Sequence, residues 1–137
     1  MTLTGNIAWA NAMLDGIGQV MGGASLSIRT GSAPGASNAA TGTVLATIVL
    51  PPTPMSPAAS GLKQKAGLWY TSALLASGTA GHWRMVTTTG AVLEGGVGIP
   101  ASGADLEITN GLGTLVLTMA TGLGVQVTSF QLRTPFI

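Results

Sequence analysis

The N-terminal segment carries the one helical pattern of apolar side chains in this sequence. These side chains recur every three or four residues, which places them on one side of an α-helix. Thr4 or Asn6 can cap its beginning, and the glycine pair at 22–23 can end it, because glycine tolerates the left-handed conformation that follows a last turn. Gly16 and Gly18 each weaken a helix by about 1 kcal/mol relative to alanine. We therefore expect this helix to depend on docking against the rest of the protein or a neighbour. The apolar series consists of Ile7, Ala10, Met13, Leu14, Ile17 and Met21.

After this segment the period of the apolar positions changes to two. Residues 25–29 alternate, with Leu26 and Ile28 on one face and polar side chains on the other. Residues 44–50 are rich in β-branched side chains and stop at Pro51, which cannot donate a hydrogen bond to a sheet. The further candidate strands, separated by turn residues such as Thr-Gly and Asn-Gly, are residues 67–75, 81–88, 91–97, 104–109, 114–120 and 125–133.

Eight short strands with no helical pattern between them predict an all-β fold. We expect an antiparallel β-sandwich, most simply a jelly roll, with one short N-terminal helix. An immunoglobulin-like sandwich is the alternative, because strand pairing is not visible in one sequence. A chain of 137 residues can bury one core, so we expect a single domain in which residues 1–23 form the helical segment and residues 24–137 the sandwich.

Charged side chains are scarce. They make up 7% of the chain and sum to a net charge of +1, whereas an average soluble domain has roughly 25%. This leaves no basic surface for nucleic acid or an anionic membrane, so we expect neither as a partner. The chain has neither a signal-peptide pattern nor an apolar run of membrane-spanning length, which is typical of a soluble protein made in a cytoplasm. The low charge indicates a surface covered by copies or partners; a neutral, hydroxyl-rich soluble surface is the alternative.

The residue types that carry chemistry are few and scattered. Asp105 and Glu107 share one side of a predicted strand, where we expect a solvated face or a pairing with Arg84 or Lys63 of a neighbouring element. The single histidine, His82, follows a glycine-containing turn and is interpreted as a turn residue. Without cysteine the chain has no thiolate nucleophile and no Cys-based metal site. We therefore predict no enzymatic activity, no catalytic or metal-binding residues and no cofactor.

The three tryptophans differ in their sequence context. Trp69 and Trp83 lie in predicted strands, where the core of the sandwich is their expected place. Trp9 lies off the main apolar series of the helix. It is either an anchor for a pocket of a partner, a role in which tryptophan is enriched, or a residue that broadens the buried face of the helix.

Residues 30–43, TGSAPGASNAATGT, separate two predicted strands. Their side chains are too small to build a core and carry no charge to recruit an ion. Such a segment can lie flat over another protein's surface through backbone and hydroxyl hydrogen bonds. The alternative is a mobile loop without a partner.

Several stretches together resemble the small virion proteins encoded among the head genes of tailed bacteriophages. They are NAMLDGI in the predicted helix, then LSIRTGSAP, ATGTVLATIVL, GTAGHWRM and PASGADLEIT. The resemblance implies a capsid decoration, or cement, protein of the virion: a β-sandwich that binds the outside of the head and bridges major capsid subunits. It also implies a homodimer or homotrimer, assembled in the host cytoplasm and located on the capsid surface.

On this interpretation the contact regions with the major capsid protein are residues 30–43 and 51–65, with the N-terminal helix as an oligomer or shell contact. Two other functions stay open: a tail or head-to-tail structural subunit, and a carbohydrate-binding module of a virion surface that would use exposed Trp69 or Trp83 as sugar platforms. The predicted partner-binding residues are Trp9, Arg29, Ser32, Pro34, Asn38, Pro52, Pro54, Lys63 and Lys65.

Overall fold

The computed structural model describes residues 4–119 and 123–133. Its helix, α1, spans Ile7–Gln19 and begins where Asn6 caps it, because the Asn6 Oδ1 accepts a hydrogen bond of 3.0 Å from the Trp9 N–H. Val20 is the C-cap, so the helix ends shortly before the glycine pair at 22–23. The predicted N-terminal helix is therefore confirmed. No helix in the described ranges has the length and hydropathy needed to cross a membrane.

The strands form one curled sheet and a small two-stranded one. The large sheet has the order β2-β1-β6-β7-β8-β10-β3, with β4 also paired to β10, and the small sheet joins β5 to β9. The strands are β1 (Ser25–Arg29), β2 (Val44–Val49), β3 (Leu62–Gln64), β4 (Tyr70–Thr71), β5 (Gly78–Thr79), β6 (His82–Val86), β7 (Val92–Gly98), β8 (Leu106–Thr109), β9 (Val116–Leu117) and β10 (Val125–Arg133).

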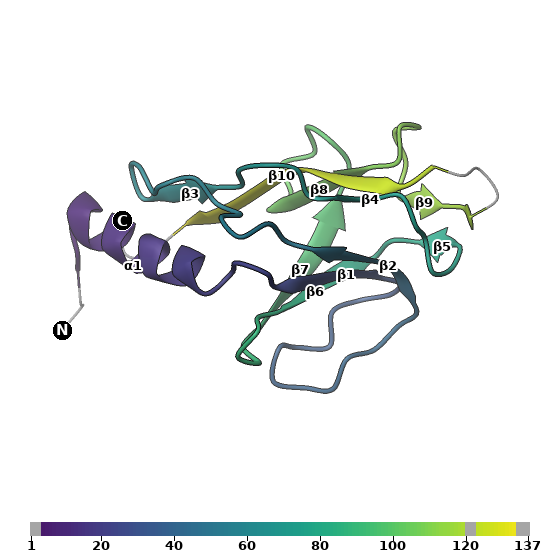
Figure 1. Ribbon diagram of the computed structural model, residues 1–137, viewed down its shortest axis with the longest axis horizontal. Coiled ribbons are helices and arrows are strands. Elements are labelled where there is room, and N and C mark those ends of the chain that lie inside the picture. The colour runs from purple at the N-terminus through teal and green to yellow at the C-terminus, as the bar shows by residue number, and fades with distance from the viewer. Residues whose placement is uncertain (1–3, 120–122, 134–137) are drawn as a thin grey trace.

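The predicted all-β class with one N-terminal helix is confirmed, but the sheet is mixed rather than purely antiparallel. The ends of β7 and β8 run parallel, with Val97 opposite Leu106 and Gly98 opposite Glu107, because residues 99–105 carry the chain back before β8 begins. Strand pairing follows one continuous path, so two separate sheets of a jelly roll are not confirmed. The path curls until β4 contacts β2 (Figure 1).

The predicted and the observed strand boundaries agree best for two of the predicted strands. Residues 25–29 and 125–133 are strands over their full predicted lengths. In contrast, residues 67–75 contain only β4, and residues 114–119 contain only β9; position 120 lies outside the described residues. The strands β3 and β5 were not predicted.

The core lies inside the curl of the sheet. Leu26 and Ile28 of β1 face inward together with Met85 and Trp83, which lie opposite them on β6. The Phe130 ring of β10 packs against both buried tryptophans: its centroid is 5.4 Å from that of Trp69 and 5.4 Å from that of Trp83. The predicted core positions of Trp69 and Trp83 are confirmed.

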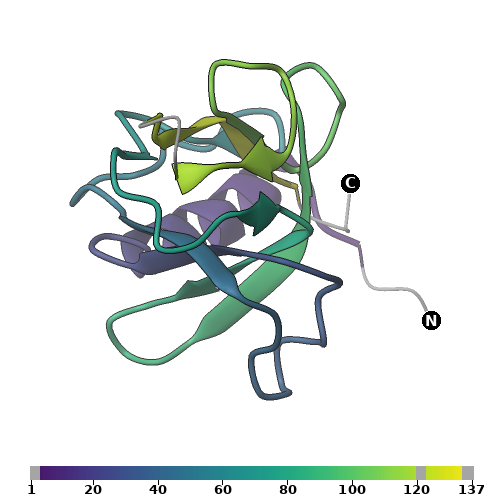
Figure 2. The same cartoon turned by 90° about the vertical axis from the view of Figure 1, so that its right-hand side faces the viewer.

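Helix α1 is peripheral to this core. It lies at one end of the longest axis of the molecule, beside β3, whereas β5 and β9 lie near the other end (Figure 1). The view along this axis in Figure 2 shows the helix behind the strands. Ala10 and Leu14 of the helix are buried, but they do not belong to the main core cluster. The fold therefore presents three surfaces for function: the helix, the loop of residues 30–43, and the strand end opposite the helix.

Candidate interaction surfaces

The loop of residues 30–43 is bonded to the outer face of its own sheet. The central contact is made by Arg84, whose guanidinium donates to the Asn38 carbonyl at 2.7 Å and to the Ala36 carbonyl at 3.4 Å. The same guanidinium donates to the Glu94 carboxylate at 3.1 Å, and Glu94 accepts the Gly35 N–H. Arg84 and Glu94 lie opposite each other on β6 and β7, so the hairpin presents one ion pair to the backbone of the loop.

This ion pair is shielded from solvent. The side chains of Arg84 and Glu94 are 9% and 4% exposed. A buried charge pair is stable only where further hydrogen bonds satisfy the remaining donors and acceptors. The loop carbonyls and the Gly35 N–H supply these bonds, so the loop and the ion pair depend on each other.

The two ends of the loop are also fixed. The Thr43 N–H donates to the Thr30 hydroxyl at 2.9 Å, and an imidazole nitrogen of His82, Nδ1, lies 2.9 Å from the Gly31 carbonyl oxygen. Because a carbonyl only accepts, Nδ1 carries the proton; Nε2 is buried without a hydrogen-bond partner. Gly42 has a φ of +78°, and a Cβ there would overlap the Thr30 carbonyl, so the closure of the loop needs glycine.

These contacts change two predictions. His82 is a fully buried residue of β6 rather than a turn residue. The loop is not free-standing, because its inner side is bonded to the sheet. Most of its side chains remain exposed, including Ser32 and Asn38, while Pro34 is half-buried. Contact of this outer side with another protein stays a prediction.

Helix α1 docks through polar groups as well as through Ala10 and Leu14 of its apolar series. The Asn11 Oδ1 accepts the Gly61 N–H at 2.9 Å, and the Asp15 Oδ1 accepts the Ala58 N–H at 2.8 Å. Asp15 also forms a 2.6 Å ion pair with Lys63 of β3. A Cβ on Gly18 would overlap the Lys63 side chain, so Gly18 makes the room in which that side chain reaches Asp15.

The ion pair acts on the acidity of Asp15. The hydrogen bond from the Lys63 ammonium, with that from the Ala58 N–H, holds the pKa of the Asp15 carboxyl below its ordinary value of 3.8. The carboxylate is therefore charged at neutral pH, and the ion pair holds the middle of the helix to β3.

Two predicted ion pairings are wrong. Arg84 pairs with Glu94, and Lys63 with Asp15, so neither basic side chain meets Asp105 or Glu107. Glu107 is buried and accepts the backbone N–H groups of the turn before β8, from Ala101 at 3.2 Å and Gly103 at 2.8 Å. Asp105 is exposed.

The predicted partner-binding residues do not form one site. Lys63 and Pro54 are buried, which corrects their prediction as contact residues: Lys63 is tied to Asp15, and Pro54 is covered within the fold. Lys65 is half-buried and donates to the Gly67 carbonyl at 2.8 Å. Arg29 is also half-buried. It donates to the Thr41 carbonyl at 3.4 Å and is thus bonded to the backbone of the loop of residues 30–43. Pro52 is exposed.

The helix leaves an apolar stripe exposed. Trp9, Met13, Ile17 and Val20 lie on one flank, and Trp9 is 63% exposed. Of the predicted apolar series, Ala10, Leu14 and Met21 are buried, but Ile7, Met13 and Ile17 are not. Half of this series therefore packs against the rest of the chain, and the other half is exposed. We call Trp9, Met13, Ile17 and Val20 the exposed stripe.

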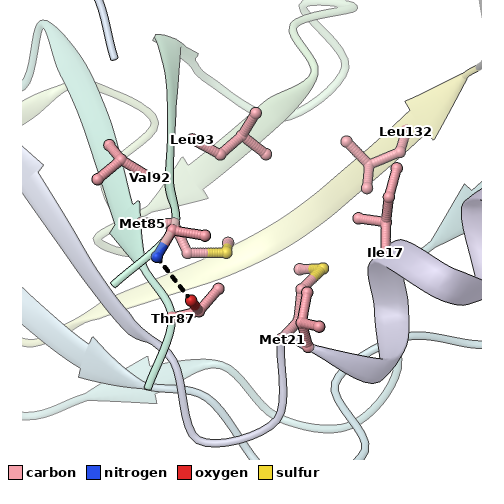
Figure 3. Close-up of a pocket in the computed structure, with 9 residues that line it drawn as sticks. Ile17, Met21, Met85, Thr87, Val92, Leu93 and Leu132 are labelled. Carbon is pink, nitrogen blue, oxygen red and sulfur yellow. Dashed lines mark hydrogen bonds between the residues drawn. The ribbon is translucent and has the colours of Figure 1, made fainter. Parts of the chain in front are cut away.

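An apolar groove continues the exposed stripe at the end of the helix. It has a volume of about 210 Å³ and lies between α1, the β6–β7 hairpin and β10. Figure 3 shows Ile17 and Met21 on the helix side, Met85 and Leu93 on the hairpin side, and Leu132 beside Ile17. Thr87 is the one polar lining residue among those described, and its hydroxyl accepts the Ala91 N–H at 3.0 Å. The surface that the groove offers to a partner is therefore almost entirely apolar.

A second exposed apolar region lies at the far end of the molecule. Leu112, Val116 of β9 and Met119 are each at least half exposed. Within the described ranges, no group of three or more His, Cys, Asp or Glu side chains is arranged to hold a metal ion.

The chain matches no protein-family model, no curated protein and no solved structure. Its function is therefore inferred from the surfaces described above.

The ion pair between Arg84 and Glu94 was not predicted. The turn between β6 and β7 is one residue longer than the predicted Thr89-Gly90 turn: Thr87 bonds to Ala91, and the resulting register places Arg84 opposite Glu94. A two-residue turn would instead place Arg84 opposite Gly95. Neither the ion pair nor its contact with the loop therefore has a local signal in the sequence.

Proposed function

We propose that this protein is a structural virion protein of the capsid decoration type, which covers and bridges major capsid subunits through neutral contacts. One observation carries the proposal: the fold buries several of its few charged side chains and leaves apolar and small neutral side chains outside. Arg84, Glu94 and Lys63 are bonded within the chain, whereas Trp9 and Leu112 are exposed. Such a surface favours lasting contact with protein rather than free solution.

The outer side of the loop is the shell contact in this proposal. Its backbone is held by Arg84, so little conformational entropy is lost when it meets a flat partner surface. Its small side chains, such as Ser37 and Ala39, let a second backbone approach closely. Repetition of modest contacts on one oligomer then raises the effective concentration of each contact.

Co-sedimentation with capsids of the source phage that lack this protein tests the proposal. We expect saturable binding of the native protein, and loss of at least about tenfold in affinity for Ala39→Glu, because a desolvated, unpaired carboxylate would lie in the contact. Ala73→Glu is the matched control: it places the same charge at another exposed alanine, after β4, and should bind as the native protein does. No binding of the native protein would refute the proposal.

The salt dependence of the same assay tests the neutral character of the contact. Raising the salt from about 0.1 to 1 M shortens the Debye length from about 10 to 3 Å. Binding through neutral groups should change little over this range. A steep fall in affinity would show that the few charged side chains direct binding, and would contradict the proposed contact.

The two other functions are affected differently by the structure. Trp69 and Trp83 are 0% and 3% exposed, so the sugar platforms that the carbohydrate-binding alternative needs are buried. A tail or head-to-tail subunit uses the same kind of neutral surface, and electron microscopy of the purified protein would reveal the closed rings or tubes that it forms.

A further inference from the structure

The exposed stripe lacks a cover of its own chain among the described residues. Trp9, Met13, Ile17 and Val20 follow one another at spacings of four, four and three residues, so they lie along one side of the helix. The one charged residue of α1, Asp15, points to the other side, where it bonds to Lys63. Apolar side chains on the exposed side of a helix as well as on the side that faces the rest of the chain are typical of a helix that is buried on both sides.

We infer that a second copy of this chain covers the exposed stripe, in a two-fold dimer with the two α1 helices antiparallel. In a two-fold interface each residue meets the same surface on the partner, so charges on it would face charges of equal sign. The exposed stripe and the groove carry no charged side chain. This surface can therefore pair with itself without repulsion.

The antiparallel arrangement also gives Trp9 a place to bind. Ile17 and Val20, which line the groove, follow Trp9 by eight and eleven positions, or about 12–16 Å along a helix axis. Two antiparallel helices related by a two-fold axis near Met13 and Gly16 place the N-terminal half of one against the C-terminal half of the other. Trp9 of each copy then reaches the groove of its partner.

The dimensions agree with this arrangement. An apolar cavity of about 150 Å³ holds a benzene ring, so a groove of about 210 Å³ has room for much of an indole ring. The exposed stripe with Leu93 offers roughly 550 Å² per copy, taking about 150 Å² for the indole and roughly 100 Å² for each of the four smaller side chains. Stable interfaces bury about 800 Å² per partner. The dimer should therefore dissociate on dilution.

The solution mass over a range of concentrations is the primary test, with Gly16→Arg as the decisive variant. A Cβ at Gly16 meets no atom within 4 Å, so the folded monomer accommodates the substitution. In the dimer two arginines would meet near the two-fold axis. We expect the native protein to double in mass as its concentration rises, and Gly16→Arg and Trp9→Ala to weaken association at least tenfold with unchanged circular dichroism.

Fluorescence quenching reports the proposed place of Trp9 directly. Trp69 and Trp83 are buried, so a soluble quencher such as acrylamide acts mainly on Trp9 in the monomer. We expect quenching of the native protein to fall as the dimer forms, and quenching of Gly16→Arg to be independent of concentration. Quenching of the native protein that stays constant while its mass doubles would overturn the assignment of Trp9 to the groove.

Leu112→Arg is the matched control, because it places the same charge at an exposed apolar residue of the far end. It should dimerise as the native protein does. A native protein that stays monomeric up to about 1 mM, or one that forms trimers, overturns the inference. So does loss of association in Leu112→Arg, which would reveal head-to-tail contacts between the helix and the far end. Capsid binding is scored separately, so the dimer and the proposed function can fail independently.

Discussion

The Arg84 guanidinium bonds to backbone carbonyls that lie 46 and 48 positions away in the sequence. The ion pair with Glu94 was not predictable from the Thr89-Gly90 turn, because the observed turn is one residue longer and shifts the register by one position. The carbonyl contacts were not predictable either, because they depend on the path of a loop whose small side chains permit many conformations. At the scale of single residues, the sequence indicates which charges are unusual in so neutral a chain, but not what they touch.

Replacing Arg84 tests whether the ion pair holds the loop. Arg84→Ala should lower the free energy of unfolding by about 3–5 kcal/mol, because it leaves the Glu94 carboxylate buried without a cation. Arg84→Lys keeps the charge and should cost less. Urea denaturation measures both, and amide exchange should accelerate at residues 35–38 in Arg84→Ala.

Arg29→Ala serves as the control for this prediction. It removes a long, exposed hydrogen bond to the Thr41 carbonyl and a 2.9 Å hydrogen bond to the Ser27 hydroxyl, leaves no charge buried without a partner, and should cost no more than about 1 kcal/mol. Equal effects of the two alanine substitutions would contradict the central role of Arg84.

At the scale of one element, α1 shows both the strength and the weakness of periodicity. The spacing of apolar residues predicts the helix, and its cap Asn6 was one of two candidates named. The side that meets the rest of the chain does not follow from the apolar series, because half of that series is exposed and Asn11 and Asp15 dock the helix through hydrogen bonds. Periodicity reports where apolar residues gather, not which side meets the same chain.

The two glycines inside α1 allow a matched test of this docking. At Gly16 a Cβ meets no atom within 4 Å, so Gly16→Ala should stabilise the protein by about 0.5–1 kcal/mol through helix propensity. At Gly18 a Cβ would displace Lys63 from Asp15, so Gly18→Ala should gain less or lose stability. Urea denaturation in dilute solution measures both. A larger gain for Gly18→Ala would show that the ion pair contributes little to docking.

The acidity of Asp15 makes the docking of α1 depend on pH. Because folding lowers the pKa of Asp15, its contribution to stability is complete above about pH 3.8 and is lost as the pH falls through the lower folded-state pKa. Below this range amide exchange in residues 7–19 should accelerate before that of β1. In Asp15→Asn this additional acid-induced step should be absent; its persistence would assign the step to another carboxyl group.

At the scale of the whole molecule, long strands were predictable and short ones were not. Alternation over β1 fixes both its type and its inward face, whereas in β10 an irregularity between Val127 and Ser129 moves the inward face from the odd to the even positions. In contrast, β4 and β9 are two-residue strands that exist only because a partner strand lies beside them. The parallel contact of β7 and β8 likewise comes from the return of residues 99–105, which no local pattern encodes. The fold class follows from local sequence, whereas the topology follows from distant pairing.

Phe130 is the residue through which the distant parts of the sheet meet, since its ring packs between Trp69, before β4, and Trp83 of β6. Phe130→Ala should therefore lower the free energy of unfolding by about 3–5 kcal/mol, because it leaves a cavity between two rigid rings. Phe130→Leu, which fills more of that space, should cost less. Val49→Ala, at a residue 70% exposed on β2, should stay within about 0.5 kcal/mol of the native protein.

Urea denaturation followed by the fluorescence of the two buried tryptophans measures all three. Both indoles share one ring partner, so a single transition is expected, and two separate transitions would show that the halves of the sheet unfold independently.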